Sequence, residues 1–309
     1  MSFSHQKKRY NVNGILLLDK PKGLSSNDAL QKIKRLYNAN HAGHTGTLDP
    51  LATGMLPICF GEATKFAKFL LNSNKRYRVI ANLGNRTDTS DSYGKILQNR
   101  PVCITLTKLL SVLNNFRGDI QQIPSMYSAL KYKGKKLYEY ARKGIEIPRK
   151  VRTITIYQLK VIHWNKNKLE LEIYCSKGTY IRTLIEDIGE ILGCGAHVIY
   201  LRRLEVANYS VHNMITFEYL NLLIKNNEII TLNKILHSLL LPIDSLVYHY
   251  PEVNILPIEA NCIKQGQSVW IMNSFNSSIV RITEGKNHKF IGIGTIMKNG
   301  KLIPTRLLV

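Results

Sequence analysis

The chain has 309 residues, of which 44% are hydrophobic, a composition typical of a globular protein with room for two domains. No apolar run approaches the ~20 residues of a membrane helix, and the apolar stretch after the basic N-terminus is too short for a signal peptide, so we expect a cytoplasmic protein with no membrane partner. The 43 Lys and Arg against 21 Asp and Glu give a formal net charge of +22, which attracts phosphate backbones or anionic membranes; a generically basic surface is the alternative.

The N-terminal part of the chain is expected to alternate short strands and helices. Residues 14–18 form an apolar run that predicts a buried strand, which a Pro-Gly turn at 19–23 ends. Ser25 or Ser26 can cap an amphipathic helix at 26–38. Beyond it we expect a loop at 41–54, a helix at 62–71, an alternating strand at 76–84, a polar loop at 86–94 and a helix at 105–116.

The segment 131–152 differs from its surroundings. It carries nine Lys or Arg and two Glu, interleaved with Tyr132, Tyr138 and Tyr140. This composition suits phosphate binding with aromatic contacts. The alternative is a solvated charged helix from Lys135 to Lys143.

The pattern changes near residue 250. Before it we expect strands at 153–163, 168–175 and 197–206, and helices at 180–192, 216–225 and 231–240. After it, short strands at 267–272, 279–283, 289–297 and 302–308 predict a small β-rich domain. This mixture favours an α+β fold over a βαβ-wound sheet, with domains at 1–250 and 251–309.

Most familiar chemical motifs are absent from the sequence. Gly292-Ile293-Gly294 lacks a third glycine at dinucleotide-binding spacing, and we find no P-loop, no His-x-x-x-His pair and no Gly-x-Ser-x-Gly elbow. The five cysteines form no Cys-x-x-Cys pair and no zinc-finger spacing, so we infer neither disulfides nor structural zinc. We therefore expect no metal and no cofactor.

One loop remains as a candidate site. It reads Gly43-His44-Thr45-Gly46-Thr47-Leu48-Asp49-Pro50-Leu51-Ala52-Thr53-Gly54. Its glycines allow sharp bends and close approach of a ligand, and Pro50 keeps Asp49 out of the helical region. From these residues alone, a functional carboxylate and a tight structural turn with a capping Asp are equal alternatives.

The loop closely resembles the catalytic loop of the TruB family of tRNA pseudouridine synthases. Five further segments resemble that family's motifs and follow its order between about 19 and 205: Asp19-Lys20-Pro21-x-Gly23-x-Ser25-Ser26, Lys75-Arg76-Tyr77, Gln122 to Lys131, Ser176 to Arg182, and Leu201 to Leu204. Several motifs in order are specific, whereas any one alone is weak.

The resemblance implies a fold and an activity. The implied fold is a mixed, largely antiparallel sheet with flanking helices, the pseudouridine synthase fold, followed by a small PUA-like RNA-binding domain. The implied activity is isomerisation of uridine to pseudouridine at position 55 in the TΨC arm of tRNA, on a flipped-out nucleotide and without a cofactor, by a monomer. A non-catalytic RNA-binding or tRNA-folding protein on the same scaffold, or a synthase acting on rRNA, are the alternatives.

The resemblance also implies the site residues. Asp49 is implied as the catalytic carboxylate, with Arg182 as the partner that keeps it ionised and Tyr77 against the uracil ring. It further implies that Tyr180 and Leu201 bound the pocket, that His44 contacts the flipped-out nucleotides, that Lys20 supports the site, and that segment 131–152 closes over RNA. Ordinary core packing or surface exposure is the alternative for each residue.

Overall fold

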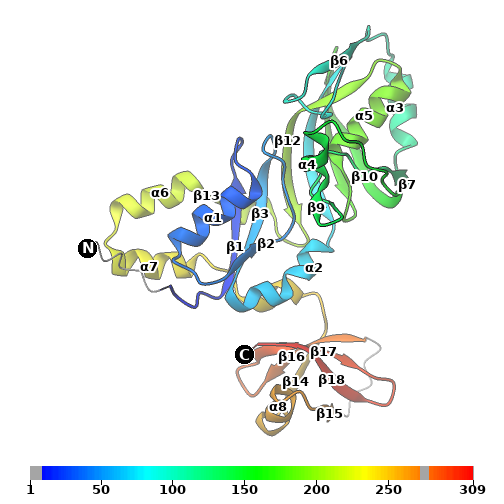
Figure 1. The fold of residues 1–309 in the computed structure, drawn as a ribbon. Helices are drawn as coiled ribbons and strands as arrows, with labels where there is room; N and C mark the ends of the chain where they lie inside the picture. Colours follow the sequence, from blue (N-terminus) through cyan, green and yellow to red (C-terminus); the bar gives the residue numbers. More distant parts are fainter. Residues whose placement is uncertain (1–8, 272–277, 309) are drawn as a thin grey trace.

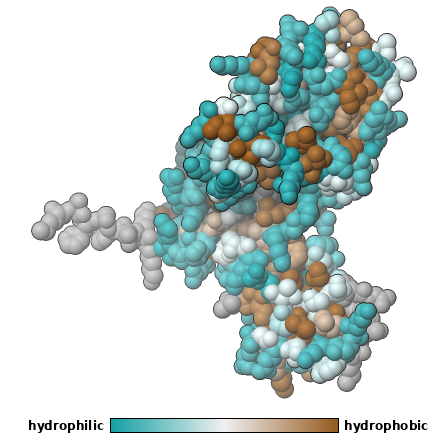
Figure 2. Space-filling model, turned by 45° about the vertical axis from the view of Figure 1, so that its right-hand side comes forward, coloured by the Kyte–Doolittle hydropathy of each residue, from teal (hydrophilic) through white to brown (hydrophobic). Residues whose placement is uncertain are grey.

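The computed structural model describes residues 9–271 and 278–308. Residues 1–8 and 309, at the ends of the two expected domains, and residue 272, the end of the expected strand 267–272, lie outside the described residues. The long part of the molecule, drawn from blue to yellow in Figure 1, is built on one large sheet. A smaller β-rich part in orange and red lies below its middle in that view, and at the bottom of the space-filling view in Figure 2. Among the described helices, none combines the length and apolar character needed to cross a membrane.

The large sheet has nine strands and is mixed but mostly antiparallel, as predicted. In order across the sheet they are β13 (Ile215–Thr216), β1 (Gly14–Lys20), β3 (Thr53–Phe60), β12 (Ala196–Val206), β4 (Lys75–Leu83), β11 (Lys168–Cys175), β10 (Arg152–Asn165) and β7 (Gly118–Gln122), with β2 (Ala42–His44) on β3. Among the described strands of this sheet, only the pairs β1–β13 and β3–β12 are parallel. The strands expected at 76–84, 153–163, 168–175 and 197–206 are confirmed within one or two residues.

Strand β3 corrects the sequence-based expectation. Its first residues were expected to belong to a loop, and the rest was given no element, yet it lies near the centre of the sheet. All residues from Gly54 to Phe60 are buried, so the run lacks the alternation that marks a half-buried strand, and Pro57 argues against a central strand. Gly54 lies where β3 meets β12: its φ is +97°, and a Cβ there would lie 2.2 Å from the Arg203 carbonyl oxygen.

The helices cover the large sheet or extend from it (Figure 1). They are α1 (Ser26–Leu36), η1 (Gly61–Phe66), α2 (Ala67–Leu71), α3 (Leu106–Asn114), α4 (Leu137–Ala141), α5 (Ile181–Leu192), η2 (Val211–Asn213), α6 (Phe217–Asn226), α7 (Ile229–Ser238) and η3 (Ile243–Val247). Ser25 caps α1 by accepting a hydrogen bond from the Asp28 amide at 3.1 Å. Helix α5 packs closely on β12, since a Cβ on Gly189 would lie 2.3 Å from the Ala196 nitrogen. It ends, as predicted, at Gly193 with a left-handed φ of 87°.

Two expected elements and one alternative differ from the structure in detail. The helix expected at 62–71 is the 3-10 turn η1 followed by α2, and β5 (Asn85–Thr87) and β6 (Ile96–Asn99) pair around the polar loop expected at 86–94. The charged helix considered for Lys135 to Lys143 is only α4, which a two-residue hairpin of β8 (Lys131–Tyr132) and β9 (Lys135–Lys136) precedes. Gly134, with a φ of 83°, lies in the turn between β8 and β9, and Gly144, with a φ of 71°, follows α4, so glycines limit the helix at both ends.

The smaller sheet has five strands in the order β14 (Glu252–Ile255), β16 (Ile279–Glu284), β17 (Lys289–Ile296), β18 (Lys301–Leu307) and β15 (Val269–Trp270). The strands expected at 279–283, 289–297 and 302–308 are confirmed within one residue, and the described part of the one expected at 267–272 contains only the two residues of β15. Strand β14 and helix α8 (Pro257–Lys264) were not expected. Phe290 of this sheet packs against Phe66 of the large part, with ring centroids 5.7 Å apart. Apolar burial therefore joins the two parts, with Ile293 inside the same cluster as Met55 and Phe66.

Candidate active site

Asp49 lies on the connection between β2 and β3, which backbone and side-chain hydrogen bonds fix in place. The Ser26 hydroxyl accepts from the Leu48 amide at 2.8 Å and donates to the Leu48 carbonyl at 3.0 Å. The Gly23 amide donates to the Pro50 carbonyl at 2.8 Å. The loop is thus held on both sides of Asp49 by the segment that starts α1.

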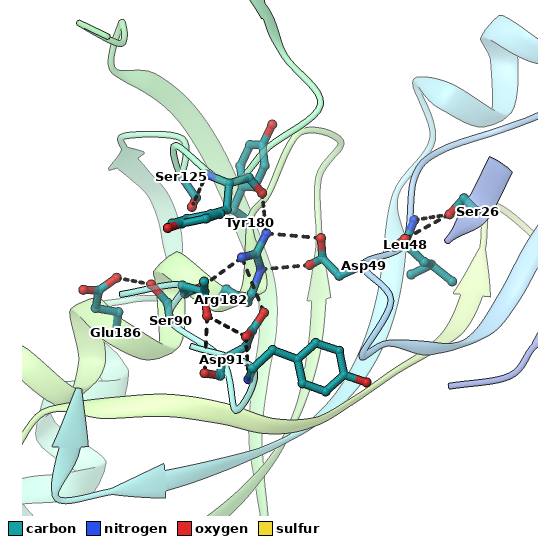
Figure 3. Close-up of polar contacts among 12 residues, drawn as sticks. Ser26, Leu48, Asp49, Ser90, Asp91, Ser125, Tyr180, Arg182 and Glu186 are labelled. Carbon is teal, nitrogen blue, oxygen red and sulfur yellow. Dashed lines mark hydrogen bonds and ion pairs between the residues drawn. The ribbon is translucent and has the colours of Figure 1, made fainter. Parts of the chain in front are cut away.

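Arg182 meets the Asp49 carboxylate at two points (Figure 3). Its Nε lies 2.8 Å from Oδ2, and its Nη2 donates to Oδ1 at 3.1 Å. Arg182 is the second residue of α5, and its side chain is only 6% exposed, against 32% for Asp49. The arginine is therefore a buried partner behind a carboxylate that still faces open space, and the two-point geometry matches the planar guanidinium.

The remaining donors of Arg182 are also occupied. Nη1 donates to the Thr89 carbonyl at 2.8 Å and lies 3.5 Å from the Asp91 carboxylate, and Nη2 donates to the Tyr127 carbonyl at 2.7 Å. Asp91 is itself fixed, because its Oδ1 accepts from the Thr89 hydroxyl at 2.7 Å and from the Tyr93 amide at 3.0 Å. The guanidinium thus has a single orientation set by groups on three separate loops.

The charges around Asp49 oppose one another. Burial raises the pKa of the Asp49 carboxyl, the Arg182 guanidinium is the largest influence against that rise, and Asp91 adds to it. Lys20 also favours the ionised form of Asp49. Because arginine stays protonated, the two-point contact persists while Asp49 is ionised.

Lys20 lies under the loop and not in the site itself. Its side chain is fully buried and donates to the Pro21 and Leu24 carbonyls at 2.9 and 2.7 Å. Burial lowers the pKa of Lys20 to about 8, although the Asp49 carboxylate acts in the opposite direction. Lys20 lines neither of the cavities beside Asp49, so it cannot contact a molecule bound there without a rearrangement.

A cavity of about 320 Å³ opens beside the Asp49–Arg182 pair. It is lined by Asp49, Tyr77, Tyr180, Arg182 and Leu201, together with backbone and side chains of the loops around them. Tyr77 and Leu201 expose only 9% and 5% of their surface, so they form the floor. The volume lies within the ~300–1,000 Å³ usual for small-molecule sites, which leaves room for a pyrimidine base.

The Tyr180 backbone is fixed at the first turn of α5 by one buried side chain. Gln122 donates from Nε2 to the Tyr180 carbonyl at 3.0 Å, and its Oε1 accepts from the Tyr180 amide at 2.8 Å. No side chain caps this helix in the usual way. Gln122, on β7, therefore fixes the start of the helix that carries Arg182.

A second cavity of about 580 Å³ also borders the Asp49–Arg182 pair. Asp49 and Arg182 line both cavities, whereas His44, Lys136 and Arg142 line only this one. His44 Nδ1 is buried and has no hydrogen-bond partner within residues 9–271 and 278–308. Burial, then the charges of Arg203 and Lys136, lower the pKa of His44, which favours the neutral form of its ring, and its Nδ1 is an unused polar atom.

Comparison with known proteins agrees with this architecture. The family model "TruB family pseudouridylate synthase (N terminal domain)" matches residues 34–181, and two C-terminal models of the same synthases match residues 182–248 and 251–308. The protein called tRNA pseudouridine synthase B in Serratia proteamaculans is 62% identical over 306 residues, which cover 98% of each chain. The chain belongs to the TruB family. It is a pseudouridylate synthase, an isomerase that makes pseudouridine from uridine.

Other relatives and solved structures agree with the TruB assignment. The tRNA pseudouridine synthase B of Yersinia pestis (strain Pestoides F) is 59% identical over 98% of this chain and 94% of its own. The solved Cbf5-Nop10-Gar1 complex contains a chain that matches 97% of this one and 85% of its own length, with a TM-score of 0.72 and 25% identity. An archaeal Nop10-Cbf5 complex gives a TM-score of 0.71 at 21% identity and supports the fold alone.

In this TruB chain the structure brings together most of the residues singled out in the sequence. Asp49, Tyr77, Tyr180, Arg182 and Leu201 line one cavity, His44 lines the other, and Lys20 lines neither. Four residues around the pair had no assigned role in the sequence reasoning: Asp91, Gln122, Tyr127 and Arg203. Three of them, Gln122, Tyr127 and Arg203, lie within segments that resemble family motifs, and this resemblance could have identified them from the sequence. For Asp91 the sequence offered only its position in a polar loop.

Proposed function

We propose that this TruB-family protein isomerises uridine to pseudouridine at position 55, in the T-arm of tRNA. It acts as a cytoplasmic monomer without a cofactor. The relatives named tRNA pseudouridine synthase B, 62% and 59% identical over nearly the whole chain, support tRNA as the substrate. The observation that carries the chemistry is the Asp49–Arg182 pair beside a cavity of about 320 Å³.

The reaction exchanges one bond for another within the nucleotide. The bond from uracil N1 to ribose C1′ breaks, the base turns, C5 joins C1′, and the proton leaves C5 while N1 gains one. A negative group beside the sugar and a proton acceptor at C5 are needed, and one carboxylate can serve both steps. Asp49 has this role because it is the carboxylate that faces both cavities with its charge held by Arg182.

The walls of the smaller cavity suit a pyrimidine. The buried ring of Tyr77 offers a face for the uracil, and stacking of this kind contributes roughly 1–3 kcal/mol. Leu201 and Tyr180 bound the base on other sides. Because the target nucleotide is stacked inside folded RNA, it must flip out to reach this cavity.

The larger cavity suits the nucleotides around the target. Its side chains include His44 and the basic-segment residues Lys136, Tyr138 and Arg142, which offer a neutral polar ring, an aromatic face and two charges for phosphates. Segment 131–152 is the RNA-contacting insertion of the catalytic domain 1–250, and 251–309 is the PUA-like RNA-binding domain. Lys20 supports the Asp49 loop from below.

The test is incubation of the protein with an unmodified tRNA transcript, followed by mapping of pseudouridine. We expect product at position 55 and none in a transcript with cytidine at that position. Asp49→Asn removes the charge and keeps the shape, so it abolishes product and leaves the Kd for tRNA within about twofold. Asp119→Asn, a matched change on exposed β7, retains activity.

Each part of the proposal has its own contrary result. Product from Asp49→Asn at the wild-type rate rejects the catalytic role of Asp49. Product at another tRNA position, or in ribosomal RNA alone, rejects the proposed substrate and keeps the chemistry. Tight tRNA binding without product in the wild-type protein favours a non-catalytic RNA-binding role.

A further inference from the structure

Helix α5 carries a second charged anchor one turn after Arg182. Glu186 lies four residues further on and on the same face of the helix. Its Oε1 accepts from Arg86 Nε at 2.7 Å, and its Oε2 accepts from the Ser90 hydroxyl (Figure 3). The Glu186 side chain is 19% exposed. Both oxygens of a mostly buried carboxylate are thus used to hold the segment 86–90.

That segment forms the turn that orients Arg182. Thr89 presents its carbonyl and Asp91 its carboxylate to Arg182 Nη1, at 2.8 and 3.5 Å. Ser90, between them, is 5% exposed and has a φ of 56°, a left-handed conformation that residues other than glycine rarely adopt. A residue in that conformation requires the surroundings to hold it there.

Three hydrogen bonds hold Ser90 in this conformation, and one of them, from its own amide to the Thr87 carbonyl at 3.3 Å, lies within the turn. The Val198 amide of β12 donates to the Ser90 carbonyl at 3.0 Å, which fixes the backbone on the sheet side. The hydroxyl donates to Glu186, which fixes the residue on the helix side. Because Glu186 and Arg182 lie on the same helix, α5 fixes the positions of both the turn that contains Ser90 and the Arg182 guanidinium.

We propose that Glu186 is a positioning residue for the isomerisation: by holding Ser90 it holds the turn that orients Arg182, and through Arg182 it orients the Asp49 carboxylate. The inference rests on the proposed role of Asp49. Glu186 lines neither cavity beside Asp49, so it acts through Arg182 and does not contact RNA in the site. A planar guanidinium that tilts loses one of its two hydrogen bonds to a carboxylate, and small misplacements at a reacting centre lower rates strongly.

The experiment compares two substitutions of Glu186 with a matched control on the same helix. Glu186→Ala removes both contacts and lowers kcat about 10- to 100-fold, with KM for tRNA within about twofold. Glu186→Gln, whose amide can accept from Arg86 and donate to Ser90, retains most of the wild-type kcat. Glu190→Ala removes a carboxylate that pairs with Arg100 at 3.1 Å, away from the turn, and leaves kcat unchanged.

A second variant keeps the test decisive if Glu186→Ala fails to fold. Ser90→Ala leaves the Arg86–Glu186 pair intact and removes only the hydroxyl, so it gives the same kcat loss. The double variant loses no more than the single ones, because both remove one shared hydrogen bond. In Glu186→Ala, Ser90→Ala and the double variant, the acid limb of the pH profile, where kcat falls as the pH is lowered, moves to higher pH. The reason is that a loosened Arg182 opposes the protonation of Asp49 less.

The contrary outcomes separate this inference from the function. If folded Glu186→Ala or Ser90→Ala keeps the wild-type kcat and acid limb, or shows its loss only in KM, Glu186 has no positioning role. If the wild-type protein itself makes no pseudouridine in tRNA, the proposed function is overturned instead.

Discussion

Ser26 binds Leu48 twice, and Leu48 is the residue before Asp49. The hydroxyl of Ser26 accepts from the Leu48 amide at 2.8 Å and donates to the Leu48 carbonyl at 3.0 Å. Ser26 is 2% exposed, whereas its neighbour Ser25 is more exposed and caps α1 through the Asp28 amide. Adjacent serines of one motif thus have different tasks: one caps a helix, and the other holds the peptide that leads to the carboxylate.

Changing each serine to alanine distinguishes the role of Ser26 from that of Ser25. Ser26→Ala leaves the Leu48 amide and carbonyl without their partner beside Asp49, so we expect kcat to fall about 10-fold or more. Ser25→Ala removes a helix cap and lowers the free energy of unfolding by about 1 kcal/mol, with kcat unchanged. Urea unfolding and single-turnover rates measure both effects, and equal kcat values for the two variants contradict the distinction.

Arg182→Lys tests the two-point contact with Asp49. Lysine keeps the charge but cannot bind both carboxylate oxygens and the Thr89 and Tyr127 carbonyls as the guanidinium does. We expect kcat to fall about 100-fold, with tRNA affinity little changed. Arg78→Lys, at a partly exposed pair with Glu170, is the matched control. Near wild-type turnover in Arg182→Lys means that charge alone suffices.

The pH profile of kcat reports the Asp49 carboxyl. Its pKa in the folded protein is raised by burial, and activity requires the ionised form. Activity therefore falls as the pH falls through this raised pKa, so the acid limb lies above the ordinary value of about 3.9 for an aspartic acid. The corresponding effect on folding has the opposite sense: ionising the group above its unfolded pKa costs stability. An acid limb at or below the ordinary value shows that Arg182 outweighs burial.

The elements that were predicted well show a clear repeating pattern in the sequence. Strands β4 and β11 alternate buried and less buried residues along their length, and helix α5 has one apolar face and a terminal glycine. Strand β3 has no such signal, since seven consecutive residues are buried and one is Pro57. Its position in the sheet depends on pairing with β1 and β12 on either side, which the local sequence does not show.

The parts of the site that one continuous segment forms could be singled out in the sequence, whereas the parts that distant segments form together could not. The glycines and Pro50 made the Asp49 loop a candidate, although a structural turn was an equal alternative until the resemblance to the TruB family favoured a catalytic carboxylate. By contrast, Arg182 on its own is consistent with a surface arginine on a helix, and its burial depends on Thr89, Asp91 and Tyr127, which the fold brings together. Lys20 was expected to support the site, and its hydrogen bonds to two backbone carbonyls place it beneath the loop.

The basic segment contributes charge to RNA binding that salt can measure. Lys136 lines the larger cavity, and Lys135 and Lys143 are exposed nearby. Changing all three to glutamine removes up to three phosphate contacts, so the slope of log K against log salt flattens by about 2–3. The same number of substitutions at Lys32, Lys34 and Lys225, on α1 and α6, is the control. Equal slopes for the two triple variants mean that segment 131–152 does not face phosphate.

Phe290→Ala weakens the contact between the two sheets. Phe290 packs against Phe66, and the fully buried Ile293 lies in the same cluster. Truncating a buried Phe costs ~3–5 kcal/mol, and because Phe290 is only half-buried we expect roughly half of that as a lower free energy of unfolding. If 251–309 also binds RNA, KM for tRNA rises while kcat stays constant, because the Asp49–Arg182 pair lies on other elements. Trp270→Ala, at an exposed position of the same small sheet, controls for a general loss of that sheet. A fall in kcat at saturating tRNA contradicts the expectation that this contact affects tRNA binding and not catalysis.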